Sequence, residues 1–246
     1  MKTIRNILIF LCITVLFVNS SISVSATNTV FTTEAMSDDE ISDFFSYTDI
    51  CMLSYEPEKD SIDCFAVNEN NMIALGFSDH DDKTVCIYTS EGAFLYGYKF
   101  KCMGSFCVDW DENNTIVYTV RGDKGFVLTE KGDVTDVFSI QNTSENHRYW
   151  NNYITLSECT VGDNEYSLRN DMGILNFIAS SYSQLVLTRS DGSETIIYDA
   201  NQKQIQKYII DFLLALFVFS ITLLSIIFSK KNSKKAQSQN TQQYNL

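Results

Sequence analysis

Short apolar runs alternate with polar turns between Ile62 and Ile140, and the same arrangement occurs twice. The first copy reads FAVNENNMIALGF followed by KTVCIYTSEGAFLYGYKF, and the second reads FCVDWDENNTIVYTV followed by KGFVLTEKGDVTDVFSI. In each copy four apolar runs are separated by an Asn- and acid-rich turn, a polar break and a glycine turn. The runs are rich in β-branched and aromatic residues, which favour strands. The pattern therefore predicts two four-stranded antiparallel units.

The expected strands of the first unit are Cys64–Val67, Met72–Phe77, Thr84–Thr89 and Ala93–Phe100, and those of the second are Phe106–Asp109, Thr115–Val120, Phe126–Thr129 and Val134–Ile140. A third, fainter copy predicts strands at Ile174–Ala179, Gln184–Thr188 and Thr195–Tyr198. The segment 142–164 in front of it is either an inserted loop or an irregular strand pair. Repeats about 40 residues apart are typical of repeating sheet units. The predicted fold class is all-β, with antiparallel propeller-like or stacked β-meander repeats over residues 61–200.

The first 26 residues have the order of a secretory signal peptide. Lys2 and Arg5 precede the apolar run ILIFLCITVLFV, and the small residues of VSA follow. We expect cleavage after Ala26. An uncleaved anchor is the alternative, and it is less favoured because a span needs about 20 apolar residues.

A second apolar block, Ile209 to Phe228, is long enough to cross a bilayer as a helix. Clustered lysines beside a span favour the cytoplasmic side, and this block is followed directly by Lys230, Lys231, Lys234 and Lys235. The sequence thus predicts a single-pass protein of the cell membrane with its bulk outside. A polar linker (201–208), one span (209–228) and a basic, polar cytoplasmic tail (229–246) would complete it.

A leader, residues 27–60, precedes the repeats and contains one helix signal. Ser37 and Glu40 stand three residues apart in front of ISDFF, which is the spacing of a capping box. Acidic residues in the first turn also suit the helix dipole. We expect a short helix from Asp38 to about Tyr47.

The exported part of the chain is strongly acidic. Residues 27–210 hold 30 acidic and 12 basic side chains, a net charge near −18. Such a field repels nucleic acid, whose binding depends on Lys and Arg, so no nucleic-acid partner is expected. It also repels anionic lipid surfaces and suits cations or basic partners. The alternative, which we favour, is that the charge keeps an exposed domain soluble.

Six cysteines follow the signal peptide, an even number in an exported domain. Cys102 and Cys107 flank MGSF between the two copies, so they could close a small loop as a disulfide. The alternative is that the cysteines are buried free thiols in apolar positions. Zinc is not expected, because neither histidine is near a cysteine pair.

The half-repeats FAVNENNMIALGF and VDWDENNTIVYTV resemble the opening of NHL-type β-propeller blades, and CIYTSEGAFLYGYKF and VLTEKGDVTDVF are similar to the closing half. The resemblance covers 62–140 well and 166–199 loosely. It implies a binding platform more often than an enzyme. The chain departs from the family pattern before the third strand, where it has DDKTV and DKGFV, and in having three countable units, which cannot close a ring. Three alternatives follow: caps formed by the Asp38 helix and the segment 141–164, a stacked sheet or sandwich, or assembly of several chains.

Two groups are candidate ligand sites. Asp109, Asp111 and Asn113 have the spacing DxDxN, which can offer three oxygens to Ca²⁺, the one cofactor considered. The later Gly and Glu of a calcium loop are missing, so turn formation by Asx side chains is the alternative.

The second group lies in the segment that interrupts the repeats: Tyr149, Trp150, Asn152 and Tyr153. These side chains could bind a carbohydrate or protein partner by stacking and hydrogen bonding. More often such aromatics pack a long loop onto a sheet. No nucleophile or phosphate-loop motif occurs, so no catalytic residue is predicted. The sequence favours a binding or interaction module, with a structural subunit that pairs through open sheet edges as the alternative and an exported hydrolase as the least favoured reading.

Overall fold

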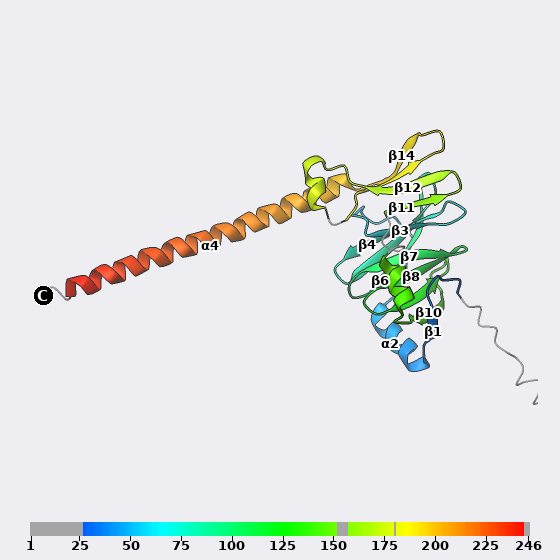
Figure 1. Ribbon diagram of the computed structural model, residues 1–246, viewed down its shortest axis with the longest axis horizontal. Helices are drawn as coiled ribbons and strands as arrows, with labels where there is room; N and C mark the ends of the chain where they lie inside the picture. The colour runs from blue at the N-terminus through cyan, green and yellow to red at the C-terminus, as the bar shows by residue number, and fades with distance from the viewer. Residues whose placement is uncertain (1–26, 152–156, 180, 244–246) are drawn as a thin grey trace, which may run out of the picture.

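The computed structural model describes residues 27–151, 157–179 and 181–243 (Figure 1). The expected signal peptide, Asn152 and Tyr153 lie outside these residues. Most of the described domain is β structure, in three antiparallel sheets that do not close into a barrel. The sequence-based expectation of an all-antiparallel β domain is therefore confirmed.

Each sheet is a meander, and two of them gain a strand from the leader. The first sheet has the order β2(Cys51–Leu53), β6(Phe94–Lys101), β5(Asp82–Tyr88), β4(Ile73–Asp79), β3(Cys64–Val67). The second has the order β1(Thr33–Ala35), β10(Val134–Ile140), β9(Lys124–Leu128), β8(Asn114–Thr119), β7(Phe106–Asp111). The third has the order β11(Glu158–Val161), β12(Asn164–Arg169), β13(Gln184–Thr188), β14(Glu194–Asp199). The eight strands expected from the two clear copies are all present, with ends that differ by a few residues.

The third copy needs a correction. The expected strand Ile174–Ala179 is wrong, because residues Gly173–Ile178 form the 3₁₀ helix η2. The Asn176 side chain accepts from the Met172 amide at 2.8 Å and donates to the Asn170 carbonyl at 3.1 Å, and such local bonds compete with strand pairing. The missing strands come earlier in the chain, as β11 and β12. The segment 142–164 is thus part helix and part sheet.

The sheets stack face to face, with the first sheet in the middle (Figure 1). One apolar core lies between the first and second sheets and includes Val85, Tyr98, Val117 and Phe126. Another lies between the first and third sheets and includes Ile73, Leu75, Cys86, Tyr166 and Leu187. Neighbouring residues of a strand point to opposite faces, so β4 supplies Ala74 to one core and Leu75 to the other.

Helix α2 (Asp38–Thr48) forms as expected and lies at the seam of the first two sheets. Its capping box is complete: the Glu40 amide donates to Ser37 Oγ at 3.4 Å, and the Ser37 amide donates to Glu40 Oε2 at 2.9 Å. Phe44 is buried and packs 5.3 Å from the ring of Phe126. The helix ends at Asp49, whose φ of 46° is left-handed.

The outer face of the second sheet is covered by the leader and by helix α3 (Ser144–Tyr149). Phe31 lies 5.0 Å from the ring of Tyr118 on β8. Asn146 of α3 is buried and fixes the leader to the helix, because its side chain bonds both the amide and the carbonyl of Thr32 at 3.0 and 2.9 Å. The segment after β10 therefore caps the outer face of the second sheet together with the leader, whereas α2 does not cover the outer face of any sheet.

Helix α4 (Asn201–Gln243) leaves the domain as one long rod (Figure 1). The expected linker 201–208 is its first two turns. Lys203 pairs with Glu58 at 2.6 Å, and Gln204 donates to the Ser181 carbonyl at 2.9 Å, which ties these turns to the domain. Within the described residues α4 is the one helix long and apolar enough to cross a membrane, and its apolar stretch is not buried against the domain.

Candidate functional site

The stacked sheets have two distinct ends. We call distal the end formed by the turns 68–72, 89–93, 111–114, 129–133, 161–164 and 189–193. Hydrogen bonds join three of these turns, one from each sheet: Asn70 Nδ2 donates to Asn113 Oδ1 at 3.1 Å, and Asn164 Nδ2 donates to Asn71 Oδ1 at 3.2 Å. The opposite, proximal end carries the start of α4.

The proximal end also carries the turns that join β4 to β5, β6 to β7, β8 to β9, and β12 to β13. The isolated bridge between Ile62 and Tyr182 joins the first and third sheets there. The pKa of Asp79, in the β4–β5 turn, is lowered chiefly by its hydrogen bond with His80, and Lys207 of α4 adds to the same shift. Lys207 of α4 is therefore near enough to the β4–β5 turn to favour the charged form of Asp79.

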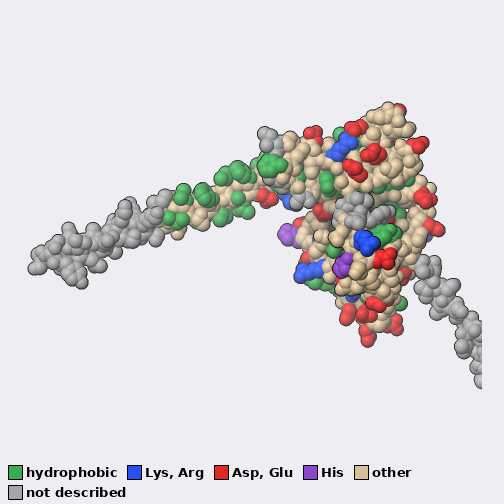
Figure 2. All heavy atoms as spheres, in the orientation of Figure 1, with side chains coloured by type: hydrophobic (Ala, Val, Ile, Leu, Met, Phe, Trp, Pro, Cys, Tyr) green, Lys and Arg blue, Asp and Glu red, His purple; other side chains and the backbone are tan. Residues whose placement is uncertain are grey.

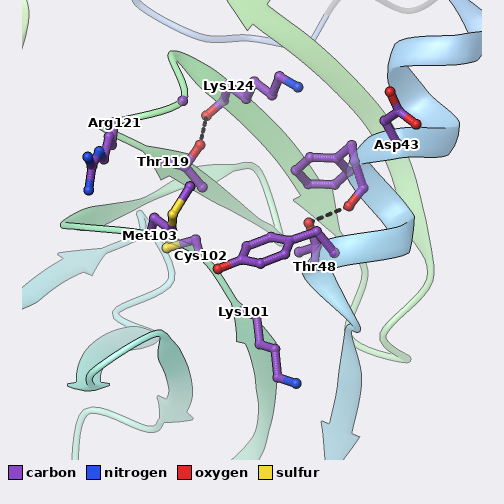
Figure 3. Close-up of a pocket in the computed structure, with 11 residues that line it drawn as sticks. Asp43, Thr48, Lys101, Cys102, Met103, Thr119, Arg121 and Lys124 are labelled. Atoms are coloured by element: carbon purple, nitrogen blue, oxygen red, sulfur yellow. Dashed lines mark hydrogen bonds between the residues drawn. The ribbon is translucent and has the colours of Figure 1, made fainter.

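A groove opens near this end between α2 and the turns that follow β6 and β8 (Figure 3). Its volume is about 300 Å³. It is lined by Asp43, Phe44, Tyr47, Thr48, Lys101, Cys102, Met103, Thr119, Arg121, Gly122 and Lys124. The amphipathic pattern of α2 places Phe44 and Thr48 inward, and the Thr48 hydroxyl is satisfied by the Phe44 carbonyl at 2.7 Å. The floor is therefore apolar and its polar atoms are paired.

Three cations surround this floor, and they come from two different turns (Figure 3). Lys101 and Arg121 are exposed, and neither forms an ion pair with any described residue. Lys124 Nζ lies 6.0 Å from the centre of the Phe44 ring, a cation–π distance. Asp43 is the one acidic residue among the described lining residues. The groove is thus locally basic in a domain that is strongly acidic.

Cys102 is the single thiol among the described groove residues. It is buried, and burial raises the pKa of its thiol to about 11. A neutral thiol is a poor nucleophile. The groove therefore holds no activated thiol. Its cations and apolar floor can bind an anionic group attached to an apolar body.

Two of the aromatic residues expected to bind a ligand, Tyr149 and Trp150, pack against the leader. The ring of Trp150 lies 4.7 Å from Phe31 and 6.0 Å from Tyr118, and the ring of Tyr149 lies 5.7 Å from Phe31. These contacts match the structural alternative, in which the aromatics hold a long loop on the sheet. Asn152 and Tyr153 lie outside the described residues.

The residues considered for Ca²⁺ lie at the end of β7 and in the following distal turn. Asp109 accepts from the Trp110 amide at 2.8 Å, and burial raises the pKa of its carboxyl. Asn113 Oδ1 is already an acceptor for Asn70. Among the described residues, no group of three or more His, Cys, Asp or Glu side chains is placed to hold a metal ion. In the structure these Asn-rich turns link neighbouring sheets.

The cysteines are free thiols throughout the described chain, and Cys102 and Cys107 are among them. The bridge between these two therefore stays a prediction, which thiol counting can decide.

Sequence reasoning missed the groove, because its residues come from three segments about 50 and 20 residues apart. The sequence holds one weak signal for the groove. Each of its three cations follows the second or fourth apolar run of a copy, so a correct assignment of strands places Lys101, Arg121 and Lys124 at the proximal end. The comparisons with known proteins add no assignment: no family model matches the chain, and no curated protein matches it.

Proposed function

We propose that this chain is a single-pass membrane protein whose extracytoplasmic domain binds an amphipathic anion in the groove beside α2. The three sheets act as propeller-like blades of an open stack, as the resemblance to NHL-type blades suggests. Helix α4 is the span, and the lysines after residue 229 favour a cytoplasmic tail. The domain is a binding module and not an enzyme.

The observation that carries this proposal is the set of cations around an apolar floor. Lys101 and Arg121 make no ion pair with described residues, although residues 27–210 hold 30 acids that could neutralise them. Arg presents a planar fork suited to carboxylate, sulfonate or phosphate groups. Exposed cations that make no ion pair and line a groove with Phe44 and Tyr47 suit an anion with an apolar body.

The size of the groove limits the ligand. Small-molecule pockets range from about 300 to 1,000 Å³, so a groove of about 300 Å³ is at the lower end. It has room for one apolar group of the size of an aromatic ring, with the anionic group held at the rim by Lys101 and Arg121.

Binding of naphthalene-2-sulfonate tests the proposal, because this probe combines one aromatic body with one anion. The full chain is placed in discs of neutral phosphatidylcholine and titrated by fluorescence anisotropy. Reversing both rim charges (Lys101→Glu with Arg121→Glu) should weaken binding about tenfold or more, since bonds to charged groups contribute about 1.5–3 kcal/mol each.

The matched control is Lys131→Glu, which reverses an exposed charge in a distal turn. It should leave the affinity unchanged, and the lipid background is common to all variants. Equal binding by the wild type, the double variant and the control would refute a ligand site in the groove.

A further inference from the structure

The proximal end of the domain is held close to the start of the apolar stretch of α4. Residues 201–208 are helical and fixed to the domain through Lys203 and Gln204. Eight residues of helix span about 12 Å. The headgroup layer of a bilayer takes up about 5–8 Å on each side of the hydrocarbon core. If α4 crosses the membrane, the proximal turns must lie within a few ångströms of the lipid headgroups.

Apolar side chains project from this end into solvent, although exposure of apolar surface to water is energetically unfavourable. Met103 is 53% exposed, Val120 is 37% exposed and Phe177 is 81% exposed. They belong to the β6–β7 turn, the β8–β9 turn and η2, so the contributions come from the first, second and third sheets. Side chains of this kind can enter the interfacial region of a bilayer.

The charges of the domain are segregated between its two ends. The distal turns hold eight acids and two bases. The proximal segments are 58–63, 79–83, 99–105, 119–124, 169–183 and 199–207, and they hold nine of the twelve bases between residues 27 and 210 together with nine acids. Helix α2, which lines the groove, adds four acids that this count does not include. Figure 2 shows acidic side chains along the edge of the domain that lies away from α4. The net charge near −18 is therefore carried by other parts of the surface.

This distribution weakens the expectation that the domain repels anionic lipid, because the proximal segments carry no net charge. Strand β6 has eight residues, so the two ends are about 25 Å apart. The Debye length at physiological ionic strength is about 8 Å, and the distal acids are screened over such a distance. Two proximal acids pair with lysines, Asp82 with Lys99 at 3.3 Å and Glu58 with Lys203 at 2.6 Å.

We infer that the groove beside α2 takes the headgroup of an anionic lipid from the same bilayer that α4 spans, so that the proximal end of the domain rests on the membrane. This inference rests on the proposed function, whose ligand class it narrows. Lys101 and Arg121 would bind the phosphate, and Met103, Val120 and Phe177 would enter the interface. The lipid is favoured over a soluble anion because the tether keeps the groove beside a high local concentration of headgroups.

Hydrogen exchange of the full chain tests the inference. The chain is compared in discs of phosphatidylcholine alone and in discs that also contain phosphatidylglycerol. Amides of 101–105 and 119–124 should exchange more slowly in the anionic discs, by about fivefold for each cation that reaches the surface. Amides of the distal turn 129–133 should exchange equally in both discs.

Two variants and one soluble anion complete the design. The protection should be lost in the double variant Lys101→Glu, Arg121→Glu and retained in Lys131→Glu. Glycerol phosphate added to neutral discs should give little protection; protection equal to that of the anionic discs would assign the groove to a soluble phosphate and overturn the inference.

Equal exchange of the wild type in both discs would also overturn it, whatever the variants do. The failure of the lipid inference is distinguishable from failure of the proposed function. In the first case naphthalene-2-sulfonate still binds in neutral discs and the double variant still loses it; in the second case the probe does not distinguish the variants.

Discussion

Removal of the Phe31 ring tests whether the leader is a structural cap. Phe31 is 5% exposed and contacts three rings, those of Tyr118 at 5.0 Å, Tyr149 at 5.7 Å and Trp150 at 4.7 Å. Truncation of a buried Phe to Ala costs about 3–5 kcal/mol. The leader can relax, because β1 pairs with β10 over three residues. We therefore expect Phe31→Ala to cost about 3 kcal/mol.

Urea unfolding of the full chain in a non-ionic detergent, followed by circular dichroism, measures this cost. A domain of this size has an m-value of about 2 kcal/mol per molar urea, so the midpoint should fall by about 1.5 M. Val30→Ala is the matched control, because the neighbouring side chain is 40% exposed. Its effect should stay within about 0.5 kcal/mol.

A double-mutant cycle with Trp150→Ala separates the aromatic contact from the loss of buried area. Rings in contact contribute about 0.5–1.5 kcal/mol beyond burial, so the coupling energy should be about 1 kcal/mol. If Phe31→Ala shifts the midpoint no further than Val30→Ala does, the leader does not cap the second sheet. A coupling energy near zero would show that Trp150 does not act through Phe31.

Two further predictions concern buried titratable groups. Burial raises the pKa of Asp109 above 3.8, so the folded state favours the neutral carboxyl and stability falls as pH rises through that range. Asp109→Asn should therefore be more stable than the wild type by about 1 kcal/mol near pH 7, and thermal melts should show this difference in stability closing below about pH 4. The control Glu112→Gln, at an exposed position, should show no such difference from the wild type. The thiols can be counted with a disulfide-exchange reagent at about pH 8: Cys51, the exposed cysteine, should react first, and Cys107, whose pKa burial raises to about 12, should react only on denaturation. In the chain without residues 1–26, which hold Cys12, six thiols on denaturation without reductant would match the structure, and four would show one disulfide.

The sequence predicted the fold best where both faces of a sheet are covered. The first sheet lies between the other two, so β4 reads as the nearly continuous apolar run IALGF and was found without difficulty. The third sheet has one covered face. Its strand β12 reads NEYSLR, in which Tyr166 and Leu168 are buried and alternate with polar residues, so no strand was predicted there. The apolar pattern that identifies a strand is therefore stronger in a sheet with two covered faces than in a sheet with one.

The candidate site could not be predicted in the same way, because it is formed between elements. The capping box correctly placed α2, but nothing in the sequence shows which sheets the helix packs against. The Asn-rich turns illustrate the opposite case. Asn113 looked like a candidate ligand or a turn residue from its spacing, and its bond with Asn70 joins two sheets. Spacing predicts local turns, whereas the partner of a side chain across sheets depends on the stacking order.

The outer faces of the second and third sheets explain how three sheets can form a domain without closing a ring. A repeat unit that buries its faces against neighbours needs a cap wherever the array ends. On the second sheet the cap is the leader with α3. The third sheet has a polar outer face: Arg169 pairs with Glu194 at 2.9 Å and donates to Ser167 at 3.1 Å, while Ile196, 54% exposed, is the one large apolar side chain of its described strands that is exposed. Both ends of the array are therefore finished within one chain, and further copies are not needed to cover them.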